Sequence, residues 1–288
     1  MELRFTDVRA LKGDSAFLID SGKTAVLCDT GFAFTGYRIA DNIKAVLGER
    51  NLDYIFLTHS HYDHAAATPY IKKRFPKTQV VASEYAQGIF SKPTAKAVMR
   101  SLDRKVAQAE GVTEYEDLFD DLSADITVKD GDIIQAGDMC FTCVSLPGHT
   151  RCSVGYYLRS KKILVGCETL GVFDGENTVV PSYLIGVKEV LASIDKVRAM
   201  DIENILLPHY GLLDKEKTAK YLRLAKESAE DTFREIADLL RQGKSREDCV
   251  EYFKNKFYKG YIKTIYPIDA MLLNTGITVD LIAKEIGM

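Results

Sequence analysis

The stretch from Tyr54 to His64 constrains the fold of this chain more than any other segment. Four apolar or aromatic residues, Tyr54-Ile55-Phe56-Leu57, come directly before Thr-His-Ser-His-Tyr-Asp-His at residues 58–64. A short run rich in β-forming residues predicts a buried strand, so the polar cluster lies in the loop where that strand ends. Imidazole and carboxylate groups are common protein ligands of zinc and similar ions. The segment therefore predicts a metal site at the end of a strand.

Histidine usage supports this interpretation. The chain has five histidines, and three of them fall within residues 59–64. In an extended His-x-His segment the two imidazoles lie on the same side, so His59 and His61 can reach one ion. Asp63 and His64 follow where the chain turns into a helix, and can point towards a second ion. The remaining histidines are His149 and His209, each of which follows a strand-like run and a proline. Their ordinary alternatives are a capped turn histidine and a satisfied core histidine, respectively.

Composition narrows the class of protein. The 288 residues are 46% hydrophobic and 27% charged, with a net charge of −3, which is typical of a globular protein and predicts no basic surface for nucleic acid. The N-terminus has no apolar export signal, and no apolar run is long enough to cross a bilayer. We therefore expect a cytoplasmic protein with a small-molecule substrate, without nucleic-acid or membrane partners; a homodimer is compatible with the sequence. The six cysteines are expected to be reduced, and Cys140 and Cys143 to point to opposite faces of one strand.

Hydrophobic periodicity predicts alternating strands and helices. Strands are expected at residues 15–20, 24–29, 53–57, 79–82, 126–128, 132–134, 139–146, 153–158, 162–166 and 204–207. Helices are expected at residues 37–48, 65–75, 183–200, 214–242, 245–257 and 276–287, with a helical insert over about 84–122. Strands followed by helix occur twice, which predicts two packed sheets with helices outside them. The expected domains are residues 1–213, including the insert, and a C-terminal helical extension at 214–288 packed on it.

The motif at residues 58–64 resembles the signature of the metallo-β-lactamase superfamily. Four further stretches resemble that family's motifs in the same order: Asp29-Thr30-Gly31, Leu146-Pro147-Gly148-His149-Thr150, Gly166-Cys167-Glu168-Thr169-Leu170 and Pro208-His209-Tyr210-Gly211. The resemblance covers residues 15–211. It implies an α/β fold, a four-layer αβ/βα sandwich with two mixed β-sheets packed face to face.

The resemblance also implies a dinuclear metal site. One ion would be held by His59, His61 and His149, and the other by Asp63, His64 and His209. The family's bridging carboxylate is normally Asp, whereas the corresponding turn here has Cys167 and Glu168. We prefer Glu168, because the following Thr-Leu aligns it with the family and its two oxygens can bridge two ions. Cys167 is the alternative, a softer ligand that favours zinc. Asp29 is expected to accept a hydrogen bond from a ligand imidazole, or otherwise simply to close a hairpin.

These ligands predict a metallo-hydrolase. Two divalent ions, zinc first and iron or manganese as alternatives, would supply a metal-bound hydroxide near neutral pH. Asp63 would orient the water or take its proton. Tyr210 would donate to the developing oxyanion, or else serve only for packing.

The helical insert and tail resemble thioesterase-like and esterase-like branches of the family, so the expected substrate is an ester, thioester or lactone. The first alternative is a phosphodiesterase or nuclease of the same fold, for which the insert has four basic residues, Lys96, Arg100, Arg104 and Lys105. Such residues more often mark a solvated helix face. The second alternative is a metal-bearing regulatory protein with incidental hydrolysis.

Overall fold

The computed structural model describes residues 3–288, which form two compact units. The first unit runs to Val144 and includes Val154–Lys161. The second comprises Ser145–Ser153 and Lys162–Met288. The domain boundary expected after residue 213 stays a prediction.

The first unit contains a six-stranded mixed sheet. Its strands are β1 (Arg4–Asp7), β2 (Phe17–Asp20), β3 (Ala25–Cys28), β4 (Tyr54–Phe56), β5 (Gln79–Ser83) and β6 (Ile126–Val128). They lie side by side in chain order, antiparallel from β1 to β3 and parallel from β3 to β6. Every residue of β2 and β3 is buried, as expected for strands covered on both faces. Strand β1 was not predicted from the sequence.

Three more strands of this unit pack on the sheet: β7 (Ile133–Ala136), β8 (Met139–Ser145) and β9 (Val154–Leu158). The ring of Phe56 on β4 lies 5.0 Å from that of Phe141 on β8 and 4.6 Å from that of Tyr156 on β9. The Tyr156 hydroxyl also donates to the Leu57 carbonyl at 2.8 Å. On β8, Cys140 is exposed and Cys143 buried, which confirms that the pair points to opposite faces.

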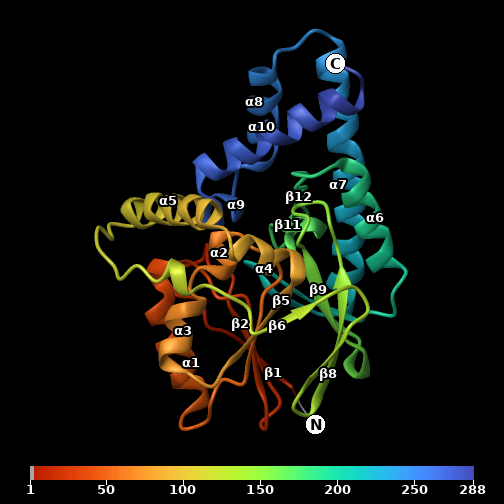
Figure 1. Ribbon diagram of the computed structural model, residues 1–288. Coiled ribbons are helices and arrows are strands. Elements are labelled where there is room, and N and C mark those ends of the chain that lie inside the picture. The colour runs from red at the N-terminus through yellow and green to blue at the C-terminus, as the bar shows by residue number, and fades with distance from the viewer. Residues whose placement is uncertain (1–2) are drawn as a thin grey trace. The chain divides into compact units, whose positions relative to one another are not determined.

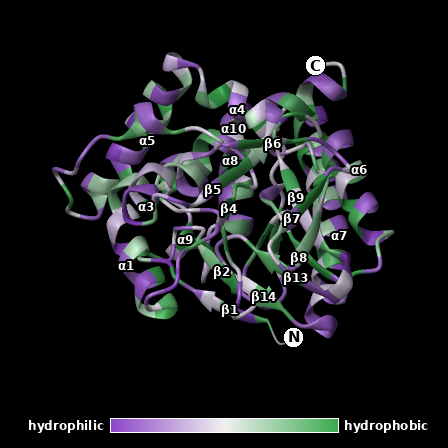
Figure 2. Cartoon of the chain, turned by 60° about the horizontal axis from the view of Figure 1, so that its bottom comes forward, coloured by the Kyte–Doolittle hydropathy of each residue, from purple (hydrophilic) through white to green (hydrophobic). Residues whose placement is uncertain are grey.

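The helices of the first unit are α1 (Gly36–Leu47), α2 (Tyr62–Ala65), α3 (Thr68–Arg74), α4 (Glu84–Phe90) and α5 (Pro93–Ala109), with 3-10 turns at η1 (Ala33–Thr35), η2 (Phe119–Asp121) and η3 (Arg159–Lys161). Figure 1 shows α1 and α3 next to one another. The apolar side predicted for α1 comprises Ile39, Ile43, Val46 and Leu47. The helix buries all of these except Val46, which is exposed. The strands of Figure 2 are largely hydrophobic, and hydrophilic residues gather on helices such as α1 and α5.

The expectation of a helical insert through residue 122 is wrong beyond Ala109. Gly111 has φ +77°, a left-handed conformation that ends helices. The following segment is held in place by side chains of α3 instead. The Tyr70 hydroxyl donates to the Glu116 carbonyl at 2.5 Å, and Lys73 forms an ion pair with the Glu116 carboxylate. The Glu116 carbonyl is thus satisfied by a side chain, and the segment forms only the short 3-10 turn η2.

The strands of the second unit are β10 (Ile163–Val165), β11 (Val172–Phe173), β12 (Val179–Val180), β13 (Asn204–Leu207) and β14 (Gly211–Leu213). β10 is parallel to β13, and β13 and β14 form an antiparallel hairpin. With β7 to β9, these three strands belong to a second six-stranded mixed sheet, whereas β11 and β12 pair only with each other. Three short strands of two or three residues each were not predicted: β11, β12 and β14.

The remaining helices are η4 (Glu168–Leu170), α6 (Val187–Arg198), α7 (Lys215–Arg241), α8 (Arg246–Phe257), α9 (Ile262–Ile265) and α10 (Ile268–Glu285). Asp214 caps α7 and Ser245 opens α8 with a capping box. Helix α10 begins at Ile268, earlier than the predicted residue 276. In Figure 1, α6 lies along α7 and α8 crosses near α10.

The fold class is therefore as predicted: α/β, with two mixed sheets, helices and C-terminal helices. None of the helices within residues 3–288 has both the length and the apolar composition that crossing a membrane requires.

Candidate metal centre

Strand β4 delivers the histidine cluster of the first unit. Phe56 is the last residue of the strand, and His61 has extended backbone as the N-cap of α2. Ring nitrogens of His59 and His61 lie within 4.8 Å of one another, and the two ring centroids are 4.7 Å apart. His59 is fully buried and His61 half-buried. The predicted pairing of these two imidazoles at a strand end is therefore present.

Asp29 organises this cluster. Its carboxylate accepts hydrogen bonds from the Thr58 backbone at 2.8 Å, the Thr58 hydroxyl at 2.9 Å and the Ser15 hydroxyl at 3.0 Å. The same carboxylate lies 2.8 Å from Nδ1 of His64. A carboxylate at Nδ1 holds the proton there, which leaves the lone pair on Nε2 for an ion. Asp29 has φ +57°, a conformation that aspartate tolerates better than most residues.

Thr58 has the same effect on His59. The Thr58 hydroxyl donates a hydrogen bond to the Asp29 carboxylate. Its oxygen therefore accepts a hydrogen bond from Nδ1 of His59 at 3.0 Å. Nε2 of His59 is then left with its lone pair. The backbone of the motif is held by Thr30, whose amide and hydroxyl both donate to the His64 carbonyl. Asp63 is partly exposed, and its carboxylate lies 3.7 Å from Nε2 of His64.

Glu168 is the centre of a second cluster, in the other unit. Its Oε2 lies 2.8 Å from Nε2 of His149, and its Oε1 lies 3.4 Å from Nε2 of His209. All three side chains are buried. Glu168 opens the η4 turn after β10, and Cys167, which is also buried, is the N-cap of that turn. The two oxygens of one carboxylate thus face two imidazoles, an arrangement suited to two cations.

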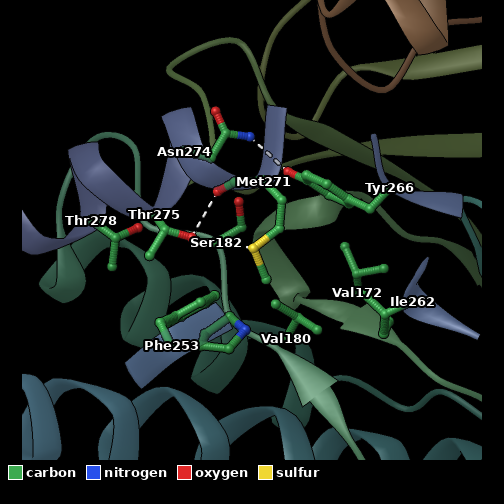
Figure 3. A pocket seen from close by; sticks show the side chains of 11 residues that line it. Val172, Val180, Ser182, Phe253, Ile262, Tyr266, Met271, Asn274, Thr275 and Thr278 are labelled. Carbon is green, nitrogen blue, oxygen red and sulfur yellow. Dashed lines mark hydrogen bonds between the residues drawn. The ribbon is translucent and has the colours of Figure 1, made fainter. Parts of the chain in front are cut away.

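Ser182 fixes the ring of His149 from the other side. The Ser182 hydroxyl lies 2.5 Å from Nδ1 of His149, and the same residue lines the pocket drawn in Figure 3. The His149 backbone amide donates to the Thr169 hydroxyl. Gly148 has φ +146°, and a Cβ there would lie 2.6 Å from a methyl carbon of Val190, so only glycine fits before this histidine.

His209 lies in a tight turn between β13 and β14. The Tyr210 amide bonds to the Leu207 carbonyl at 3.4 Å, Pro208 follows Leu207, and His209 has φ +60°. This is the signature of a type II turn, whose third residue is usually glycine. A histidine there costs roughly 1–2 kcal/mol in backbone strain, and such strain is typical of functional positions.

Tyr210 is half-buried among aromatic rings. Its ring centroid lies 5.2 Å from that of Phe173 and 6.0 Å from that of Tyr261. Both interpretations of Tyr210, oxyanion donor and packing residue, stay open.

Three supporting residues were missed by the sequence analysis: Thr58 as a partner of His59, Ser182, and Tyr261. Thr58 is the first residue of the motif and directly precedes His59, so its hydroxyl was a usable signal. Ser182 is 33 residues from His149 and Tyr261 is 52 residues from His209, so no local pattern marks them.

The protein is α/β with two mixed sheets. Its strand ends present histidines held by oxygen partners, and one carboxylate lies between two imidazoles. This combination is typical of a metal-dependent enzyme. The chain belongs to the metallo-beta-lactamase superfamily, whose family model matches residues 12–209. This confirms the resemblance seen in the motifs.

The similarity to individual proteins is more distant. A hydroxyacylglutathione hydrolase of Stenotrophomonas maltophilia is 28% identical over 140 residues, 49% of this chain and 40% of that protein. The chain thus matches about two fifths of the length of such curated relatives. A metallo-beta-lactamase family protein from Thermus thermophilus has a TM-score of 0.65 at 16% identity, over 94% of this chain and 88% of that one. A superfamily protein from Sulfolobus tokodaii has a TM-score of 0.57 at 18% identity, over 77% and 80%. These structures share the fold.

Proposed function

We propose that this protein is a metal-dependent hydrolase with two divalent ions. His59, His61 and His149 would bind one ion, Asp63, His64 and His209 the other, and Glu168 both. The observation that carries the proposal is the placement of Glu168 between the Nε2 atoms of His149 and His209. Two buried imidazoles and a carboxylate are a donor set that fits zinc and also accepts iron or manganese.

The first unit fits the same requirement. Oxygen partners at Nδ1 of His59 and His64 leave Nε2 for an ion. A catalytic zinc site needs three protein ligands, so the pair His59 and His61 calls for a third, and the family resemblance supplies His149.

When bound, the ions lower the pKa of water and polarise the bond under attack. Asp63 is suited to take the proton of the attacking water, because its carboxylate is partly exposed next to buried His64. Tyr210 is the residue that we assign to the developing oxyanion. Its hydroxyl would donate to that oxygen, and the surrounding rings would hold its orientation.

An ester, thioester or lactone is the proposed substrate. The name of the curated relatives, hydroxyacylglutathione hydrolase, supports an acyl compound of this kind. The nuclease alternative is weakened by the insert itself. Arg100 pairs with Asp117 and Asp120, and Arg104 with Asp117, so part of its positive charge is neutralised locally.

Metal analysis of His61→Ala tests the proposal. We expect loss of at least one metal equivalent and of hydrolysis, because the first ion loses one of its imidazoles. Wild-type protein is screened with thioesters, lactones, aryl esters and bis-(p-nitrophenyl) phosphate, each with zinc, manganese and iron.

Cys140→Ala is the control, because Cys140 is exposed and is not among the proposed ligands; it should keep both metal content and turnover. Full metal loading and wild-type turnover in His61→Ala would refute the proposal. Turnover of the phosphodiester alone would favour the nuclease alternative.

A further inference from the structure

The C-terminal helices make a direct contact with the turn that carries His209. The hydroxyl of Tyr261, at the N-cap of α9, donates to the carbonyl of His209 at 2.5 Å. The rings of Tyr261 and Tyr210 meet edge to face, at 82°. Tyr261 therefore contacts both His209 and Tyr210.

This contact falls where the turn is strained. His209 has φ +60°, which a residue with a Cβ rarely adopts. It lies in the turn of the β13–β14 hairpin, whose register pairs Leu207 with Gly211. A hydrogen bond to the His209 carbonyl fixes the plane of the peptide, and with it the backbone angles that aim the imidazole.

Tyr261 is itself held by a packed core. Seven buried residues of the β11–β12 hairpin and the C-terminal helices form one cluster, against which Tyr258, Tyr261 and Tyr266 pack. Figure 3 shows Phe253, Val180 and Met271 of this cluster around a pocket of only about 20 Å³, room for roughly one water. Because Tyr261 packs against this cluster, its position depends on that of the C-terminal helices.

We propose that Tyr261 is a positioning residue that holds His209 in its ligating conformation, so that the C-terminal helices set the affinity of one metal ion. The inference rests on the proposed function, since it takes His209 to be a ligand. It assigns a role to a residue outside the matched superfamily region, residues 12–209.

Tyr261→Phe removes the hydroxyl and keeps the ring. We expect one equivalent of cobalt(II) to bind about tenfold more weakly than in the wild type, and the other equivalent to bind unchanged. Tenfold is the low end of the affinity loss that follows removal of a residue that orients a metal ligand. Chelator competition and the cobalt absorption spectrum measure this without reference to activity. The thermal midpoint of the metal-free protein should stay near that of the wild type.

Tyr258→Phe is the matched control, because the Tyr258 hydroxyl donates to the carbonyl of Tyr266 at 3.1 Å within the same helices. It should leave both cobalt affinities unchanged. Unchanged affinity in Tyr261→Phe, a loss shared equally by Tyr258→Phe, or a lower thermal midpoint without an affinity change would each overturn the inference.

His209→Ala separates the two proposals. If His209→Ala loses one cobalt equivalent while Tyr261→Phe binds like the wild type, only the positioning role fails. If His209→Ala keeps both equivalents, His209 is not a ligand and both the ligand assignment and the positioning role fail.

Discussion

The proposed ligands depend on residues that hold them, and those residues differ from one histidine to the next. Asp29 and Thr58 each belong to one of the sequence motifs. Asp29 contacts Nδ1 of His64, and Thr58 contacts Nδ1 of His59. The Ser182 hydroxyl lies at Nδ1 of His149 as the Thr58 hydroxyl lies at Nδ1 of His59, whereas Nδ1 of His64 has the Asp29 carboxylate. A neutral hydroxyl makes an imidazole a weaker donor to metal than a carboxylate does.

Glu168 and Cys167 provide a test at this scale. We predict that Glu168→Ala lowers metal occupancy more than Cys167→Ala does, because the Glu168 carboxylate faces both His149 and His209. Metal content of the two purified variants, after equilibration with the same free zinc concentration, measures this. Circular dichroism checks that both variants are folded. The reverse order would make Cys167 the ligand.

Among the elements, α5 holds the loop that follows Asp29. The Asp103 carboxylate, fully buried on α5, accepts from the Ala33 amide at 2.8 Å and from the Tyr115 hydroxyl at 2.5 Å. Asp14 accepts from the neighbouring Phe32 amide at 3.0 Å. Two buried carboxylates thus fix one short loop, and burial raises the pKa of both.

Asp103 makes stability depend on pH. Burial raises the pKa of its carboxyl from 3.8 to about 7. Between these values the folded protein keeps a proton that the unfolded chain has lost, so this group lowers stability as pH rises to about 7 and has no further effect above it. We predict that Asp103→Asn gains stability relative to the wild type between about pH 5 and about pH 7.5. Urea unfolding at both pH values measures the difference; parallel pH profiles for the two proteins would contradict it.

At the scale of the whole molecule, the proposed donor set draws on both units. His59, His61, Asp63 and His64 belong to one, and three further donors, His149, Glu168 and His209, to the other. Ion binding then favours the complete folded chain over the unfolded one, because the unfolded chain has no such site.

Metal removal should therefore lower stability. At a free zinc concentration about 100 times the Kd, each site adds about 2.7 kcal/mol to the free energy of unfolding. We predict a lower urea midpoint after chelation, and a smaller response to zinc in His61→Ala. Unfolding curves with zinc and with chelator measure both. Equal midpoints in the wild type would contradict metal binding by the folded state.

The sequence by itself determined the class of fold, most long strands and helices, the superfamily and the positions of the candidate ligands. These follow from short-range patterns: apolar periodicity, and histidines and carboxylates at strand ends. Two helix boundaries have local signals that the periodicity did not capture: Gly111 follows the end of α5, and Pro267 precedes α10. Tertiary structure alone decided the partners Ser182 and Tyr261, because their contacts join residues tens of positions apart and no local pattern encodes them. The Tyr54–His64 stretch specifies the chemical groups that can bind metal. How firmly His209 is held depends instead on its contact with Tyr261, 52 residues further along the chain.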